Sequence, residues 1–254
     1  FLFTIPDAMF WGILGTMAQK LVLRADEATR REDRTAIRAW CAERAEDVAA
    51  FATARDAALW EEATAFGCDF EETSRRKLEA LDVKLGGGGH YPLLYFLTRW
   101  HKPRIVVETG VAAGFSTQAI LVALDRNGQV RLYSSDFPYF RLDNPERFIG
   151  CLVDEPLKAR WTLHKKGDRD GLPRIVQSVD MIDLVHYDSD KSYPGRRWAL
   201  GLLGPKLAPN AIVMMDDIQD NGFFRDYVER NRARYQVFTF GGKFVGLIWP
   251  GERG

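Results

Sequence analysis

The chain has 254 residues, of which 46% are apolar and 28% are charged, and its 35 basic residues balance its 35 acidic ones. A chain of this length can bury a large core as one domain with an elaboration. Its zero formal net charge disfavours a nucleic-acid-binding protein, which normally carries a basic excess. No CxxC pair occurs, which disfavours a disulfide framework or a structural zinc site and favours a reducing compartment, so a cytoplasmic location is expected. The three cysteines are Cys41, Cys68 and Cys151.

The chain begins with an apolar stretch that Pro6 and Asp7 interrupt. The uninterrupted run 8–18 is about half of the roughly 20 residues that a membrane span needs, so no stable span is expected. A buried or interface helix, a helix on a membrane surface and the remnant of a longer segment all stay open. Because large exposed apolar patches are rare on monomers, we expect a homo-oligomer that buries this stretch.

Residues 17–66 have the composition of a helix, with scattered apolar positions and neither Pro nor Gly. Gly67 is expected to end this helix, and a shorter one follows over 71–81. The glycines 86–89 predict a loop, because four consecutive glycines lose too much entropy in a helix. We therefore divide the chain into a helical extension, 1–85, acting as an oligomer interface or lid, and a main domain, 86–254.

From residue 102 onward, apolar strand-like runs alternate with helical stretches. Alternation at this spacing predicts parallel strands with right-handed crossovers, and hence a doubly wound α/β sheet. A pair of glycines then separates two final runs, 235–240 and 243–250, which predict an antiparallel hairpin and bring the total to seven strands. The five earlier predicted strands are 104–109, 131–136, 161–168, 181–188 and 211–217.

Ligands bind such sheets at the carboxyl ends of the strands. The first strand ends in "ETGVAAGFST", where Gly110 permits a sharp turn and Gly114 lets a ligand approach the next helix. Asp136, at the tip of the second strand, is placed to accept hydrogen bonds from ribose hydroxyls, and "KGDRDGLP" offers Gly167 and Asp168 for an adenine edge. A nicotinamide dinucleotide is disfavoured, since Ala112 replaces the glycine that contacts the pyrophosphate.

The loop "ETGVAAGFST", followed by paired tip acids and a terminal hairpin, resembles that of the class I, metal-dependent O-methyltransferases. Catechol and caffeoyl-CoA O-methyltransferases belong to this group, as do sugar O-methyltransferases of macrolide and aminocoumarin biosynthesis. The resemblance covers about residues 86–250 and implies a Rossmann-like fold that binds S-adenosylmethionine. The candidate cofactor-binding residues are Glu108, Thr109, Gly110, Gly114, Ser116, Thr117, Asp136, Gly167 and Asp168.

Carboxylates gather at the tips of the fourth and fifth strands, in "HYDSDKSYPG" and "AIVMMDDIQDN". Acids placed together repel one another, which indicates either a bound cation or a proton that must be moved. The resemblance implies that Asp188, Asp216 and Asp217 hold a divalent cation, and Mg²⁺ is expected because it prefers oxygen ligands. The Asp-Asp pair is found in the sugar-modifying enzymes, so a sugar or polyol acceptor is favoured over a catechol.

Two residues compete to be the base that removes the acceptor proton. Asp190 lies where one sugar-modifying branch of the resembled group carries a catalytic aspartate, and Lys191 lies where catechol-type enzymes carry a catalytic lysine. Many relatives have histidine at the second place, and its absence here leaves the base open. Asp190 is slightly favoured, because nearby carboxylates raise the pKa of a lysine.

The function expected from these patterns is methyl transfer from S-adenosylmethionine to a hydroxyl of a small molecule. A metal-independent methyltransferase and a non-catalytic cofactor-binding module remain alternatives. Acids at strand tips also serve as helix caps, Asp170 is close enough to replace Asp168, and His186 fits a core position. His90, after the glycine loop, is either a lid residue or an ordinary loop residue. The sequence does not identify the acceptor.

Overall fold

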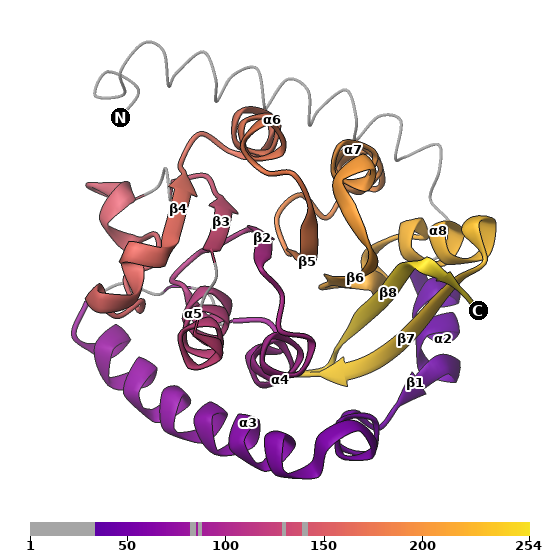
Figure 1. The fold of residues 1–254 in the computed structure, drawn as a ribbon, viewed down its shortest axis with the longest axis horizontal. Coiled ribbons are helices and arrows are strands. Elements are labelled where there is room, and N and C mark those ends of the chain that lie inside the picture. Colours follow the sequence, from indigo (N-terminus) through magenta and orange to yellow (C-terminus); the bar gives the residue numbers. More distant parts are fainter. Residues whose placement is uncertain (1–33, 82–84, 86–87, 129–130, 139–141) are drawn as a thin grey trace.

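The computed structural model describes residues 34–254 except 82–84, 86–87, 129–130 and 139–141. The apolar N-terminal run, and the interface expected there, lie outside the described residues. The described chain forms an α/β fold around one mixed sheet, with strand order β1-β7-β8-β6-β5-β2-β3-β4 (Figure 1). Its strands are β1 (Ala45–Glu46), β2 (Ile105–Thr109), β3 (Arg131–Ser135), β4 (Trp161–His164), β5 (Ile182–Tyr187), β6 (Leu207–Met215), β7 (Ala233–Phe240) and β8 (Lys243–Arg253).

The predicted doubly wound sheet is confirmed. Strands β2 to β6 pair in parallel, as the helix-strand alternation requires, while β8 runs antiparallel to both β6 and β7. Helices cover both faces, with α3, α4 and α5 on one side and α6, α7 and α8 on the other (Figure 1). The helices are α2 (Arg34–Arg44), α3 (Val48–Glu79), α4 (Tyr91–His101), α5 (Phe115–Asn127), α6 (Asp168–Ser178), α7 (Tyr193–Leu203) and α8 (Phe223–Asn231).

The N-terminal extension contributes one strand more than the seven predicted. Within the stretch expected to be one helix, Ala45 and Glu46 are extended and pair in parallel with Val237 and Phe238 of β7. The helix resumes because the Asp47 side chain accepts a hydrogen bond of 2.7 Å from the Ala50 amide and so caps α3. Two residues are too few for periodicity to reveal a strand.

The expectation that a helix ends at Gly67 is wrong. Helix α3 continues through this residue to Glu79, and the irregular position lies earlier, at Asp56, where φ is −162° and ψ is 99°. A Cβ atom on Gly67 would lie 2.8 Å from Cγ of Pro92. Glycine is therefore used here because α4 packs closely against α3, which is a tertiary reason that the local sequence does not carry.

The extension shares the core of the main domain. Phe51 of α3 packs 5.0 Å, centroid to centroid, from Phe238 of β7, and Trp60 packs 5.8 Å from Phe96 of α4. These rings are buried together with the apolar side chains of α4, α5 and β2. No helix among the described residues is both long and apolar enough to cross a membrane.

Candidate active site

The loop between β2 and α5 turns sharply beside the end of β5. Gly110 and Gly114 both have positive φ, +81° and +101°. A Cβ atom on Gly110 would lie 2.8 Å from the carbonyl oxygen of Asp188, and one on Gly114 would lie 2.9 Å from Cα of Gly150. Both glycines are therefore needed for conformation and for space. The sharp turn expected at Gly110 is present, whereas Gly114 makes room for Gly150, and the ligand contact expected at Gly114 stays a prediction.

Glu108 is buried and supports this loop from inside. Its carboxylate accepts hydrogen bonds of 2.6 Å from Ser116, 2.8 Å from Thr117 and 2.8 Å from Ser134. These partners come from α5 and β3, so the carboxylate links two strands and a helix. Three of the residues expected at the cofactor site, Glu108, Ser116 and Thr117, are thus held together with Ser134 through the Glu108 carboxylate.

Asp136 also lies at the loop, with its carboxylate against the backbone. It accepts hydrogen bonds of 3.1 Å and 2.7 Å from the amides of Val111 and Ala112, and one of 2.6 Å from Phe137. Burial raises the pKa of Asp136 to about 6, although these amide hydrogen bonds act in the opposite direction. The acid at the tip of β3 therefore lies against the glycine loop, and its expected hydrogen bonds to ribose hydroxyls stay a prediction.

Gly167 and Asp168 open helix α6 on the same side of the sheet. The Gly167 amide donates a 2.9 Å hydrogen bond to the carbonyl of Asp136. Asp168 accepts a hydrogen bond from the Ser189 hydroxyl, and Ser189 lies 2.9 Å from the Thr109 hydroxyl. The predicted cofactor residues after β2, β3 and β4 are thereby connected to the loop after β5.

The expected metal-binding acids also meet at neighbouring strand ends. The Asp188 amide donates to the carbonyl of Thr109 at 3.0 Å, and the Asp216 amide donates to that of Tyr187 at 3.1 Å. Ligand atoms of His186, Asp188 and Asp216 all lie within 4.8 Å of one another. The structure therefore adds His186, which the sequence placed in the core, to two of the three predicted acids.

His186 is completely buried between two carboxylates. Its Nδ1 atom lies 3.7 Å from Glu108 Oε1, and its Nε2 atom lies 3.9 Å from Asp216 Oδ2. These distances exceed those of hydrogen bonds, and among the described residues neither ring nitrogen, nor Asp216 Oδ1, has a hydrogen-bond partner. Burial lowers the pKa of His186, but the flanking carboxylates raise it more strongly. Buried nitrogen and oxygen atoms that lack a hydrogen-bond partner can serve as ligands of a cation.

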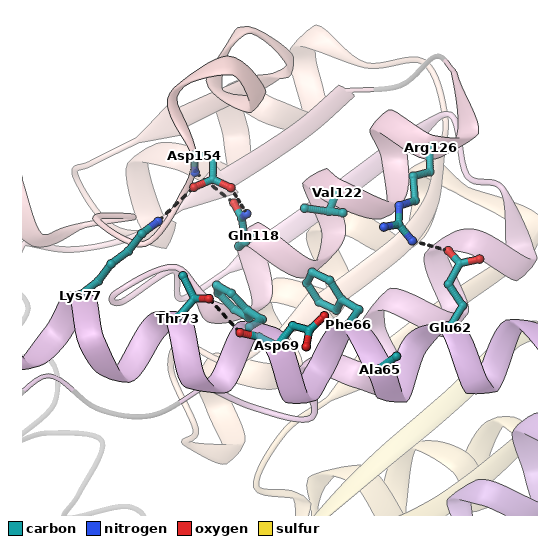
Figure 2. Close-up of a pocket in the computed structure, with 11 residues that line it drawn as sticks. Glu62, Ala65, Phe66, Asp69, Thr73, Lys77, Gln118, Val122, Arg126 and Asp154 are labelled. Carbon is teal, nitrogen blue, oxygen red and sulfur yellow. Dashed lines mark hydrogen bonds and ion pairs between the residues drawn. The ribbon is translucent and has the colours of Figure 1, made fainter.

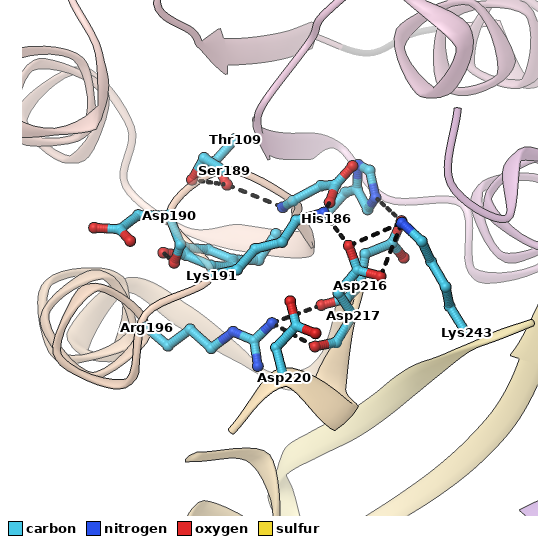
Figure 3. Close-up of polar contacts among 12 residues, drawn as sticks. Thr109, His186, Ser189, Asp190, Lys191, Arg196, Asp216, Asp217, Asp220 and Lys243 are labelled. Atoms are coloured by element: carbon cyan, nitrogen blue, oxygen red, sulfur yellow. Dashed lines mark hydrogen bonds and ion pairs between the residues drawn. The ribbon is translucent and has the colours of Figure 1, made fainter. Parts of the chain in front are cut away.

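Asp217 faces two lysines. It adopts a left-handed conformation with φ +53°, and its carboxylate forms an ion pair with Lys191. Lys243, the first residue of β8, lies 3.1 Å from the other carboxylate oxygen (Figure 3). All three predicted acids are thus near one another, but Asp217 is engaged by ammonium groups rather than grouped with His186.

Arg196 of α7 fixes the turn that carries the two acids. It is fully buried, and its Nη2 atom donates hydrogen bonds of 2.8 Å and 2.9 Å to the carbonyl oxygens of Asp216 and Asp217 (Figure 3). No local pattern indicates this role, because an arginine in a surface-like helix pattern is normally exposed.

The two candidates for the base differ in orientation. Asp190 accepts a 3.1 Å hydrogen bond from the Ser192 amide next to the start of α7, and its carboxylate points away from Asp216 (Figure 3). Lys191 points toward the acids, with Nζ 2.8 Å from Asp188 Oδ1. Burial lowers the pKa of Lys191, but Asp188 and Asp217 raise it more strongly, above its ordinary value.

The end of the glycine-rich loop lies against Asp216. A Cβ atom on Gly89 would overlap the carboxylate of Asp216. The next residue, His90, caps α4 by accepting a 3.3 Å hydrogen bond from the Leu93 amide, and its ring stacks on Phe240 at 4.3 Å. Burial lowers the pKa of His90 to about 4. His90 thus has a packing role, and Gly89 allows the loop to approach the acids.

A separate groove of about 370 Å³ lies between α3 and α5 (Figure 2). Phe66, Phe70 and Val122 line it with apolar side chains. An ion pair between Lys77 and Asp154 lies at one end, and another between Arg126 and Glu62 lies at the other. None of the predicted site residues lines this groove.

Comparisons with known proteins agree with this geometry. Residues 107–218 match the family model described as a methyltransferase domain, a range that includes the glycine loop and the three acids. A search of curated proteins finds no match. The predicted enzyme class, a methyltransferase, is confirmed by the domain match.

Solved structures share the fold. The O-methyltransferase TomG from Streptomyces achromogenes, in complex with S-adenosylmethionine, is similar at 17% identity and a TM-score of 0.54, over 81% of this chain and 90% of that one. An O-methyltransferase from Bacillus cereus with bound S-adenosylhomocysteine is similar at 18% identity and a TM-score of 0.52, over 70% of this chain and 89% of that one. A methyltransferase from Geobacter sulfurreducens is similar at 21% identity and a TM-score of 0.53, over 73% of this chain and 88% of that one. At these identities the similarity confirms the class I methyltransferase fold.

Proposed function

Since residues 107–218 match a methyltransferase domain within a class I fold, we propose that this chain transfers the methyl group of S-adenosylmethionine to a hydroxyl of a small molecule, beside a bound divalent cation. The observation that carries this proposal is the juxtaposition of two clusters. The glycine loop with Asp136 lies at the ends of β2 and β3, and the acids Asp188 and Asp216 lie at the ends of β5 and β6.

The cofactor would be held by the loop after β2. Gly110, Gly114 and Gly167 provide backbone free of side chains, and Asp136 supplies a carboxylate at the strand tip. Glu108 would act indirectly, because its three hydrogen bonds hold Ser116 and Thr117 in place. When bound, S-adenosylmethionine supplies an electrophilic methyl group on a sulfonium. Two solved structures of the same fold contain this cofactor or its product, which supports the proposal.

The cation would be held by Asp188 and Asp216 with a third donor. If Asp217 is the third ligand, the donors are all oxygen, which suits Mg²⁺. If His186 is the third ligand, its ring must release the proton that Glu108 and Asp216 favour, and the mixed donor set then also suits Mn²⁺ or Zn²⁺. A bound divalent cation lowers the pKa of a coordinated hydroxyl.

A base near the acceptor would complete the site. A positioned base is typically worth about 10²–10⁴-fold in rate. We keep Asp190 as the favoured candidate, because Lys191 is held by the carboxylates of Asp188 and Asp217. Since the Asp190 carboxylate points away from Asp216, this role requires its side chain to turn toward the acceptor. Replacing Asp190 with Asn should keep cation binding and lose turnover, whereas Lys191→Met should lose turnover only if lysine is the base.

The acceptor class is also part of the proposal. The Asp216–Asp217 pair, together with the resemblance to sugar-modifying enzymes, favours a sugar or polyol hydroxyl over a catechol. We further propose that the chain acts in the cytoplasm and as a homo-oligomer through its N-terminal apolar stretch. Light scattering at micromolar concentration tests the assembly, and a monodisperse monomer would contradict it.

Titration calorimetry with S-adenosylhomocysteine tests the cofactor site directly. Asp136→Ala should weaken binding by about 1–3 kcal/mol, the loss expected for a hydrogen bond to a charged group. Asp125→Ala, at an exposed residue near the end of α5 that pairs with Arg160, is the matched control and should leave the affinity unchanged. Equal affinity in wild type and Asp136→Ala would remove Asp136 from the site, and absence of binding in wild type would contradict the proposed function.

A further inference from the structure

Two lysine ammonium groups lie among the acids where the proposed cation would bind. Lys191 Nζ lies 2.8 Å from Asp188 Oδ1 and also contacts Asp217 Oδ2. Lys243 Nζ lies 3.1 Å from Asp217 Oδ1. One ammonium therefore bridges acids from two strand ends, as a metal ion would, and a second one neutralises Asp217 from the other side (Figure 3).

Both lysines extend from backbone that other side chains hold. Asn221 donates a 2.6 Å hydrogen bond to the carbonyl of Lys191, which fixes the loop after β5. Arg38 of α2 donates a 2.7 Å hydrogen bond to the carbonyl of Gly242, in the turn that leads to Lys243. The two ammonium groups therefore reach Asp217 from separate elements that are each anchored in the fold.

The two ammonium groups offset the negative charge of the acid cluster. Three carboxylates, those of Asp188, Asp216 and Asp217, converge at the tips of β5 and β6. Carboxylates at such short range repel one another unless a positive charge lies between them. Lys191 and Lys243 provide two positive charges, so most of the repulsion is already relieved without an added ion.

We propose that Lys191 and Lys243 are built-in counter-ions that compete with the divalent cation for Asp217 and Asp188. This inference rests on the proposed cation site and adds that the cation must displace Lys191 from the acids. A cation and an ammonium that use the same carboxylate oxygen lower each other's affinity by the same factor, because coupling between two sites is reciprocal. The native lysines therefore weaken metal binding.

Binding of Mn²⁺, followed by electron paramagnetic resonance or calorimetry, tests this competition without measuring activity. We expect Lys191→Met to bind Mn²⁺ at least about fivefold more tightly than wild type, at the lower end of typical coupling. Lys243→Met should show a smaller gain, since its side chain is 61% exposed against 32% for Lys191. The matched control is Lys158→Met, which removes a lysine of similar exposure, 37%, from an ion pair with Glu155 outside the site.

Thermal unfolding gives a second readout. In a chelator, Lys191→Met should unfold at a lower temperature than wild type, because the acids lose a counter-ion, and added Mn²⁺ should raise its midpoint more than that of wild type. Unchanged or weaker Mn²⁺ affinity in both variants, with wild type binding, would overturn the inference and leave the cation site intact. Mn²⁺ binding by Lys191→Met and Lys243→Met but not by wild type would support the inference and show that the lysines replace the metal. No Mn²⁺ binding in any variant would overturn both the inference and the cation site.

Discussion

Replacing Arg196 with Met should loosen the turn that carries Asp216 and Asp217. Methionine is unbranched like arginine but shorter and has no donor, so the two carbonyl oxygens that now accept hydrogen bonds of 2.8 Å and 2.9 Å lose their partner. A hydrogen bond from a charged donor contributes about 1.5–3 kcal/mol, so two contribute about 3–6 kcal/mol. Part of this is offset, because a buried guanidinium carries a desolvation cost that the variant no longer has.

The net loss should be about 2–4 kcal/mol of unfolding free energy. For a chain of this size, about 3 kcal/mol corresponds to a fall in the thermal midpoint of roughly 6–12 °C. Calorimetry in the presence of a chelator measures this loss without a contribution from a bound ion. Arg196→Lys is the comparison, since it keeps a positive donor and should lose less. A midpoint for Arg196→Met within about 2 °C of wild type would refute the assigned role.

Three further variants test the cofactor loop. Gly114→Ala places a side chain at φ +101° and 2.9 Å from Gly150. The strain costs about 1–3 kcal/mol and should lower the affinity for S-adenosylhomocysteine, and an undiminished affinity would contradict a role of this loop in cofactor binding. Glu108→Ala leaves three buried hydroxyls without their acceptor. It should lower the free energy of unfolding, measured in urea, by about 2–4 kcal/mol. A change below about 0.5 kcal/mol would contradict the supporting role of Glu108. For the ligand-free protein, the pKa of Asp136 is about 6, above its ordinary value. The folded state then binds this proton more tightly than the unfolded chain, so stability should fall as pH rises from about 4 to 6. Asp136→Asn should flatten that slope, and an identical pH profile would contradict the raised pKa.

The fold was largely accessible from local patterns. Apolar runs ending in acids identify β2, β5 and β6, because a parallel strand buried on both faces reads as a continuous apolar segment. The sequence of β3, RLYSS, is not such a run, and β3 is recognised by its place in the alternation and by Asp136 after it. These strands place Glu108, Asp136, Asp188 and Asp216 at the same edge of the sheet. That edge follows from topology alone, so the proximity of these residues was predictable without knowing their side-chain orientation.

The parts that escaped prediction depend on tertiary contacts. Gly67 looks like a helix terminator until Pro92 is seen to pack against it. His186 alternates like a core residue of β5, and only the neighbouring strands place Glu108 and Asp216 beside its two nitrogens. Lys243 lies 26 residues from Asp217 in the chain, and no local pattern connects a hairpin lysine with a strand-tip acid.

Metal-dependent turnover is the most direct test of the proposed function. With an acceptor that the wild type methylates, EDTA should abolish methyl transfer from S-adenosylmethionine, and Mg²⁺ or Mn²⁺ should restore it. Asp188→Asn should remove the restored turnover while leaving S-adenosylhomocysteine affinity nearly unchanged, because the proposed cofactor site is at the ends of β2 and β3 and Asp188 follows β5. Full turnover by the chelated wild type would contradict the account.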